Sequence, residues 1–183
     1  MSSQPRKTAD IARVIARRRE AAIAGEETWA LVRRIAVLAL AAFLVLTQVF
    51  LVTQVEGTGM FPALEDGDVV LVYRLQGSYA RSDVIAYQVD GERCFGRIVA
   101  QAGDEVTITE NGSLLINSQL ESGEILFPTN TADGQTFTQK VPAGCVWVMG
   151  DYRTQTQDSR DFGPIPLTDV EGKVITLLRR RGL

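Results

Sequence analysis

The hydrophobic pattern of the chain changes once, near residue 55. From Ile35 to Val55 the sequence has 21 residues without a charge, interrupted only by two Thr-Gln pairs. As a helix, such a run can cross a hydrocarbon core of about 30 Å. A buried core helix rarely stays uncharged over this length, and the apolar part of a cleaved signal peptide spans only about 7–15 residues. We therefore predict a permanent transmembrane helix at residues 35–55.

Beyond Val55 the apolar residues come in short runs separated by turn-forming residues, a pattern typical of β-strands. The Asn111-Gly112 pair predicts a hairpin turn, because both residues accept positive φ. Residues 121–140 are polar and turn-rich, which indicates a long excursion. We predict a mainly β, antiparallel domain over residues 56–183. The expected strands are 68–75, 83–89, 93–100, 105–109, 114–117, 145–149 and 174–178.

The charges predict how the chain is oriented in the lipid bilayer. Residues 1–34, which we expect to be a helical tail, contain eight basic and four acidic side chains, and the remainder contains 11 basic and 18 acidic ones. The positive-inside rule places such a basic tail in the cytoplasm and residues 56–183 outside the cell membrane. The acidic character of the outer domain argues against nucleic acid as a partner.

The chain contains no histidine, which excludes Ser-His-Asp and Cys-His mechanisms and most zinc sites. No cofactor and no metal are expected. Cys94 and Cys145 both lie in the predicted outer domain, where a disulfide is permitted. Two free thiols are an equally good prediction, because the sequence gives no distance between the two residues.

Three motifs follow one another in the predicted outer domain. The first is Gly57 to Leu64, the second runs from Arg97 to Asp104, and the third is Gly150-Asp151-Tyr152-Arg153 followed by Asp158-Ser159-Arg160. In this order they resemble the signal peptidase I family, in particular its short Gram-positive type, and the spacing of the third motif is the most specific. The resemblance implies an antiparallel β domain and a membrane-bound serine endopeptidase that removes signal peptides with a Ser–Lys dyad.

Neither dyad side chain is present where the motifs require it. The family's nucleophile position holds Gly59 and its lysine position holds Gly96. A tyrosine, Tyr152, stands at the usual asparagine of the third motif, while Thr156 keeps a supporting hydroxyl. The resemblance implies that the rest of the peptide groove and its support are retained: Met60, Pro62, Arg97, Gly150, Asp151, Arg153, Thr156, Asp158, Ser159 and Arg160.

A neighbouring side chain could in principle replace the lost nucleophile. Thr58 is one residue away, but adjacent side chains of an extended segment point to opposite faces. Lys140 and Lys173 are the two lysines of the predicted outer domain. Losing one member of a nucleophile–base unit costs on the order of 10⁶ in turnover in a well-studied serine protease. The pair of glycines therefore favours an inactive protein.

Three functions fit this sequence. The first is a non-catalytic assembly factor that binds exported or pilin-like precursors, as the resemblance to family members with a substituted dyad implies. The second is an active signal peptidase with a relocated Thr/Lys dyad. The third is a diverged structural subunit whose groove is closed and whose partner is another membrane protein.

Overall fold

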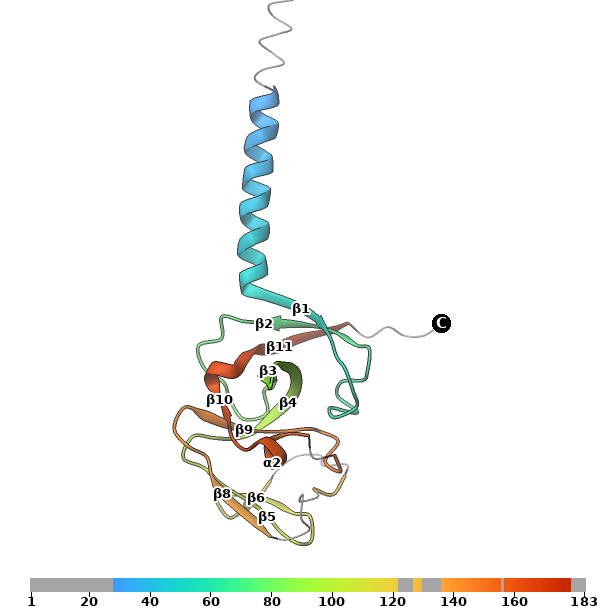
Figure 1. Ribbon diagram of the computed structural model, residues 1–183, viewed down its shortest axis with the longest axis vertical. Helices are drawn as coiled ribbons and strands as arrows, with labels where there is room; N and C mark the ends of the chain where they lie inside the picture. The colour runs from blue at the N-terminus through green and yellow to red at the C-terminus, as the bar shows by residue number, and fades with distance from the viewer. Residues whose placement is uncertain (1–27, 122–126, 130–135, 156, 179–183) are drawn as a thin grey trace, which may run out of the picture. The chain divides into compact units, whose positions relative to one another are not determined.

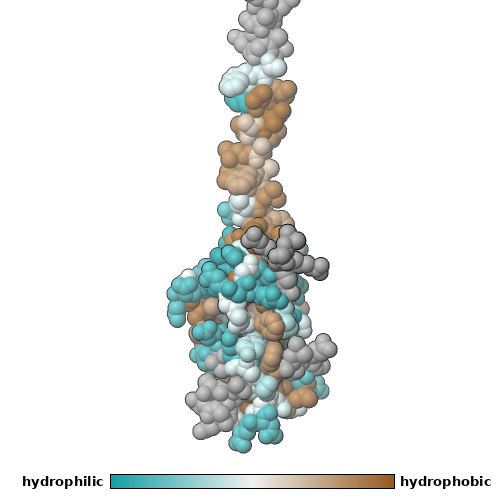
Figure 2. All heavy atoms as spheres, turned by 90° about the vertical axis from the view of Figure 1, so that its right-hand side faces the viewer, coloured by the Kyte–Doolittle hydropathy of each residue, from teal (hydrophilic) through white to brown (hydrophobic). Residues whose placement is uncertain are grey.

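The computed structural model describes residues 28–121, 127–129, 136–155 and 157–178, and it divides the chain into two units, Met1–Thr47 and Gln48–Leu183. The predicted helical tail lies almost wholly outside the described residues. The described part of the first unit belongs to a helix, Thr28–Val49, which is long and apolar enough to cross a membrane and whose last two residues fall in the second unit. Its side chains are exposed along its length, and Figure 2 shows them as a mostly apolar surface.

The helix differs from the predicted span at both ends. It includes Arg33 and Arg34, and it ends at Val49, where strand β1 (Phe50–Gln54) begins. Residues 50–54 form a strand because they pair with β2 (Val69–Tyr73), with Phe50 opposite Tyr73 and Gln54 opposite Val69. The backbone hydrogen bonds of this pairing replace those of a helix, so an uncharged run of 21 residues contains both elements.

The second unit is built on an antiparallel sheet of seven strands (Figure 1). Its spatial order is β1-β2-β11-β3-β4-β9-β10, so the last long strand lies between the second and the third. The strands not yet defined are β11 (Val170–Leu178), β3 (Val84–Val89), β4 (Glu92–Gln101), β9 (Cys145–Met149) and β10 (Ile165–Pro166). The described strands confirm the predicted fold class: mainly antiparallel β, with one N-terminal apolar helix.

A smaller sheet of four strands has the order β7-β6-β5-β8 (Figure 1). Its strands are β7 (Gln119–Leu120), β6 (Leu114–Ile116), β5 (Glu105–Ile108) and β8 (Phe137–Lys140). The end of the predicted polar excursion is therefore a strand, β8, which pairs with β5. Two short helices, α2 (Ser159–Phe162) and η1 (Leu167–Asp169), precede β11.

A hydrophobic cluster holds the first motif against the large sheet. Met60 and Leu64 are 2% and 4% exposed, and they pack with Val55, Val70 and Val72. Burying a side chain of this size contributes roughly 1.5–3 kcal/mol. The loop between β1 and β2 is therefore fixed by its own apolar residues.

The two cysteines are free thiols in the structure. Strands β4 and β9 pair with Arg97 opposite Met149 and Gln101 opposite Val146. Cys94 and Cys145 therefore lie at opposite ends of this strand pair, several residues apart along the strands. A disulfide requires a Cα–Cα distance of about 4.4–6.8 Å. Of the two alternatives left open by the sequence, free thiols fit this register.

Candidate functional site

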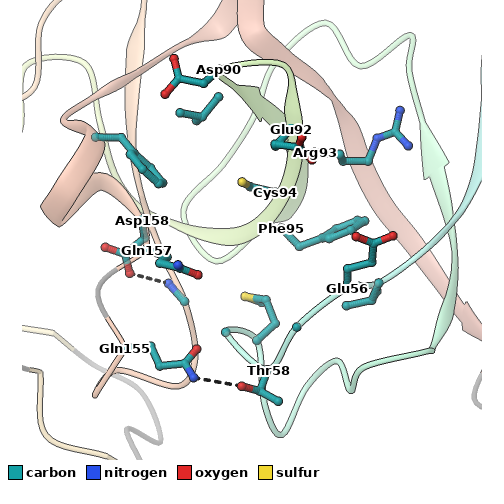
Figure 3. Close-up of a pocket in the computed structure, with 17 residues that line it drawn as sticks. Glu56, Thr58, Asp90, Glu92, Arg93, Cys94, Phe95, Gln155, Gln157 and Asp158 are labelled. Atoms are coloured by element: carbon teal, nitrogen blue, oxygen red, sulfur yellow. Dashed lines mark hydrogen bonds between the residues drawn. The ribbon is translucent and has the colours of Figure 1, made fainter.

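A cleft of about 390 Å³ lies where three segments of the second unit meet. One wall is the loop 55–60, and the second is formed by the turn and the first residues of the β3–β4 hairpin. The third wall comes from Gly150, Gln155, Gln157, Asp158 and Phe162. Figure 3 shows Thr58 and Gln155 facing each other at one end of the cleft, and Asp90 and Glu92 at the other. Sequence motifs one and three thus meet in space.

One wall of the cleft is a strand with a free edge. Strand β4 pairs with β3 from Glu92 to Arg97, but on its other side it pairs with β9 only from Arg97 onward. Among the described strands, none occupies this second edge between Glu92 and Gly96. Cys94 and Phe95 in this stretch line the cleft. An unpaired strand edge presents N–H and C=O groups to an added strand.

The loop carrying Thr58 and Gly59 is a turn, so the expectation of an extended segment is wrong. The Phe61 N–H donates to the Thr58 carbonyl at 3.0 Å, and the Leu64 N–H donates to the Met60 carbonyl at 2.9 Å. The Thr58 hydroxyl accepts a hydrogen bond from the Gln155 amide at 3.0 Å. Pro62 is exposed beside this turn. The strict alternation of side chains therefore does not decide where Thr58 points.

Gly150 joins the first and third motifs by close backbone approach. A Cβ at this position would lie 2.4 Å from the Gly59 carbonyl oxygen, so no other residue fits without movement of the loop. The Tyr152 N–H donates to the same carbonyl at 3.0 Å. Gly59 is thereby fixed on the end of β9.

The structure brings Gly59, which lines the cleft, and Gly96, which does not, close to the same residue, Gly150. Arg97 pairs with Met149, so Gly96 and Gly150 are the next residues along the two strands, and Gly150 contacts Gly59. A Cβ on Gly59 would meet Gln155 Oε1 at 3.8 Å, an ordinary contact. The glycine at the nucleophile position is therefore not required by packing.

Gly96 has much less space around it. A Cβ there would lie 2.4 Å from Val148 Cγ1 and 3.3 Å from Tyr87 Cε1. Both neighbours are fully buried, and Tyr87 has no hydrogen-bond partner for its hydroxyl among the described residues. A side chain at position 96 therefore requires the Val148 side chain to rotate away. Nothing in the sequence pattern identifies Val148 as a neighbour of Gly96.

Asp158 is the centre of the third motif. Its carboxylate accepts hydrogen bonds from the Gly150 N–H at 2.9 Å and the Arg160 N–H at 3.0 Å, and it forms an ion pair with the Arg160 guanidinium at 2.7 Å. The Asp158 and Arg160 side chains are 3% and 2% exposed. Ser159 accepts a hydrogen bond from the Val148 N–H at 2.9 Å. These contacts hold the segment after β9 in place; Thr156 lies outside the described residues.

The two remaining predicted support residues are arginines paired with carboxylates. Arg97 makes a two-pronged contact with Asp151, at 2.8 and 2.6 Å. Arg153 is 4% exposed and pairs in the same way with Glu121, at 2.6 and 2.8 Å. Its Nε also donates to the Gly150 carbonyl. No sequence motif includes Glu121, which is distant along the chain from the third motif.

No lysine of the described chain lines the cleft with Thr58. Lys173 forms an ion pair with Asp83 at 2.5 Å, and Lys140 lies on β8 opposite Glu105. Cys94 does line the cleft, but burial, and then the nearby Glu92 carboxylate, raise the pKa of its thiol. The neutral thiol is a weak nucleophile, since the thiolate is the reactive form.

Arg93, in the cleft lining, gives a prediction for the pH dependence of stability. Its guanidinium donates to both oxygens of Glu171 and thereby lowers the pKa of that carboxyl from its ordinary value. The stabilisation is present above the unfolded-state pKa and is lost as the pH falls through the lower folded-state pKa. We expect Glu171→Gln to lower the melting temperature at pH 6, and the difference from the parent protein to shrink by pH 3. Thermal melts followed by circular dichroism in neutral detergent measure this difference in melting temperature. A difference that does not change with pH would contradict the link between the lowered Glu171 pKa and stability.

Comparisons with known proteins place this arrangement in a family. The family model for signal peptidase, peptidase S26, matches residues 28–178. A signal peptidase I of Bacillus caldolyticus is 29% identical over 136 residues, 66% of this chain and 74% of the relative. A probable chloroplast thylakoidal processing peptidase 2 of Arabidopsis thaliana is 28% identical over 134 residues, 66% of this chain but 36% of the relative. The crystal structure of a signal peptidase I from Enterococcus faecalis V583 matches with a TM-score of 0.46 and 28% identity, covering 54% of this chain and 97% of that one.

The chain belongs to the signal peptidase, peptidase S26, family. The family resemblance predicted from the three motifs is thereby confirmed, as a distant relationship to bacterial signal peptidase I. Membership implies peptide substrates or ligands. Together with the apolar helix Thr28–Val49 it indicates single-pass anchoring in a membrane.

Proposed function

We propose that this protein is a non-catalytic, membrane-anchored member of the family that binds extended segments of exported or pilin-like precursors as an assembly factor. The observation that carries the proposal is the free edge of β4 between Glu92 and Gly96, because this stretch borders the cleft. Both dyad positions, Gly59 and Gly96, are glycines. An extended peptide can add to this edge as a further strand. The open cleft of about 390 Å³ argues against a closed groove.

The proposal includes an orientation in the cell membrane. The basic residues 1–34 lie in the cytoplasm, the apolar helix crosses the bilayer, and the β domain is extracytoplasmic. The cleft then meets clients as they emerge from the membrane. The proposed site residues are the groove and support residues named above, with no retained catalytic side chain.

The two dyad positions provide neither the nucleophile nor the base that a serine–lysine mechanism needs. Gly59 has no atom to attack a scissile carbonyl, and Gly96 has none to accept a proton. Thr58 is hydrogen-bonded to Gln155, and the described lysines Lys140 and Lys173 do not line the cleft. A hydroxyl needs an adjacent base to become a nucleophile.

The proposal is tested by measuring cleavage and binding together. We expect the full chain in neutral detergent to leave a fluorogenic signal-peptide substrate uncut, while the anisotropy of a labelled precursor peptide rises on binding. Thr58→Ala should leave the absence of cleavage unchanged. Cleavage by the parent protein that Thr58→Ala abolishes would establish the active alternative with a relocated dyad. Absence of both cleavage and binding would overturn the assembly role.

A gain-of-function series tests why activity is absent. Gly59→Ser fits the available space, whereas Gly96→Lys meets Val148. We therefore expect Gly59→Ser with Gly96→Lys to show little cleavage, and added Val148→Ala to raise it by making room for the lysine stem. Gly59→Ser with Val148→Ala, without the lysine, is the matched control and should remain inactive.

A further inference from the structure

We propose that the cleft selects extended segments that carry a lysine or arginine about four residues from the position beside Gly59. This inference rests on the proposed peptide-binding function and adds the chemical class of the bound segment. The ligand is a cationic stretch of polypeptide in extended conformation. The argument depends on which charges of the cleft are neutralised and on where they lie along it.

Three exposed carboxylates of the cleft have no ion-pair partner among the described residues. Asp90 and Glu92 flank Gly91 at the β3–β4 turn, and Glu56 lies on the facing loop. Asp90 has a φ of 53° and Gly91 one of 87°, so the turn is fixed by residues that accept positive φ. The carboxylates therefore come from two different walls of one cleft.

The other charged side chains of the cleft lining are already neutralised. Arg93 pairs with Glu171 and also donates to the Thr53 hydroxyl at 3.0 Å. Asp158 pairs with Arg160. Among the residues that the structure describes, the lining thus keeps three negative charges that no ion pair compensates, and a cationic ligand is the complement.

The opposite end of the cleft is neutral. Thr58, Gln155 and Gln157 line it near Gly59 and offer hydroxyl and amide groups. Figure 3 shows this separation, with Asp90 and Glu92 at the upper end and Thr58 and Gln155 at the lower end. A strand added along the β4 edge would pass from the neutral end to the acidic end.

The spacing of residues along a strand gives the number of peptide residues that lie between the acidic end and the neutral end of the cleft. Residues advance by about 3.3 Å along a strand, so the stretch from Glu92 to Gly96 corresponds to roughly 13 Å. Gly96 is level with Gly150, which contacts Gly59. A ligand residue beside Gly59 is therefore about four residues away from one beside Glu92.

The test uses three labelled twelve-residue peptides built from Ala, Ser, Thr and Gln, which carry two Lys, two Gln or two Glu residues at each end. Their dissociation constants are measured by fluorescence anisotropy with the full chain in neutral detergent. We expect the Lys peptide to bind about three- to tenfold more tightly than the Gln peptide and the Glu peptide to bind most weakly, as for exposed charge pairs. Raising the salt from 50 to 500 mM should remove the differences, because salt screens exposed charges.

Matched variants assign the effect to the cleft. Asp90→Asn with Glu92→Gln keeps the turn conformation and should make the Lys and Gln peptides bind equally. Glu105→Gln with Glu110→Gln removes two exposed charges from outside the cleft lining and should preserve the preference.

The outcomes separate this inference from the proposed function. Equal binding of the three peptides at low salt would overturn charge selection and leave peptide binding intact. A preference that persists in Asp90→Asn with Glu92→Gln would also overturn it. Failure of every peptide to bind would overturn the proposed function together with this inference.

Discussion

Replacing Asp158 by alanine is expected to lower the free energy of unfolding of the β domain by about 3–5 kcal/mol, because the substitution removes the buried carboxylate of the Asp158–Arg160 ion pair. The Gly150 and Arg160 N–H groups lose their acceptor in the same step. Since domains are stable by about 5–15 kcal/mol in total, this is a large fraction. At roughly 2–4 °C per kcal/mol for a domain of this size, the melting temperature should fall by about 6–20 °C.

Thermal melts followed by circular dichroism measure the effect of Asp158→Ala. The matched control is Asp161→Ala, which removes an exposed carboxylate three residues away and should change the unfolding free energy by less than about 0.5 kcal/mol. A double variant, Asp158→Ala with Arg160→Met, removes both charges and should recover part of the loss. Equal effects of Asp158→Ala and Asp161→Ala would contradict a structural role for the buried pair.

Gly150→Ala is expected to destabilise the domain by about 1–3 kcal/mol, the usual cost of an added methyl group in a packed region. The new Cβ would meet the Gly59 carbonyl oxygen at 2.4 Å and the Gly59 carbonyl carbon at 3.3 Å. Backbone atoms cannot rotate aside as a side chain can, so the loop must retreat from β9. The hydrogen bond from Tyr152 to Gly59 is then lost.

This second prediction has two measurements. The melting temperature should fall, and on the proposed function the affinity for a precursor peptide should fall by at least about tenfold, because one wall of the cleft is displaced. Gly77→Ala is the control, since its Cβ would have no neighbour within 4 Å. A Gly150→Ala protein with unchanged melting temperature and unchanged peptide affinity would show that the loop contact is unimportant.

The sequence predicts these strands because their apolar residues alternate with polar ones or cluster in short runs, and this pattern can be seen within a few neighbouring residues. Residues 68–75, 83–89, 93–100, 105–109, 114–117 and 145–149 each contain an observed strand or most of one. Strand β1 was missed because Phe50–Gln54 is as apolar as the helix before it, and its pairing with β2 is a long-range contact. Strand β8 was missed because Phe137–Lys140 has little apolar character of its own.

Some features of the candidate site can likewise be predicted from local sequence patterns, and others depend on long-range contacts. The motifs identified Gly59, Gly96 and the residues around Asp158, and spacing alone was enough for that. The free edge of β4 was not predictable, because it exists only where β9 ends its pairing at Met149. The carboxylates of Asp90 and Glu92 belong to no motif and enter the cleft through the β3–β4 turn.

The sequence by itself determined the apolar helix, the antiparallel β class, the family and the absence of side chains at both dyad positions, because each of these is recorded in residue types and spacing. The tertiary structure decided three other matters. It showed that Gly150 must be a glycine beside Gly59, that Val148 occupies the space beside Gly96, and that one strand edge stays open along the cleft. All three depend on distances between residues far apart in the chain, and no local pattern encodes such distances.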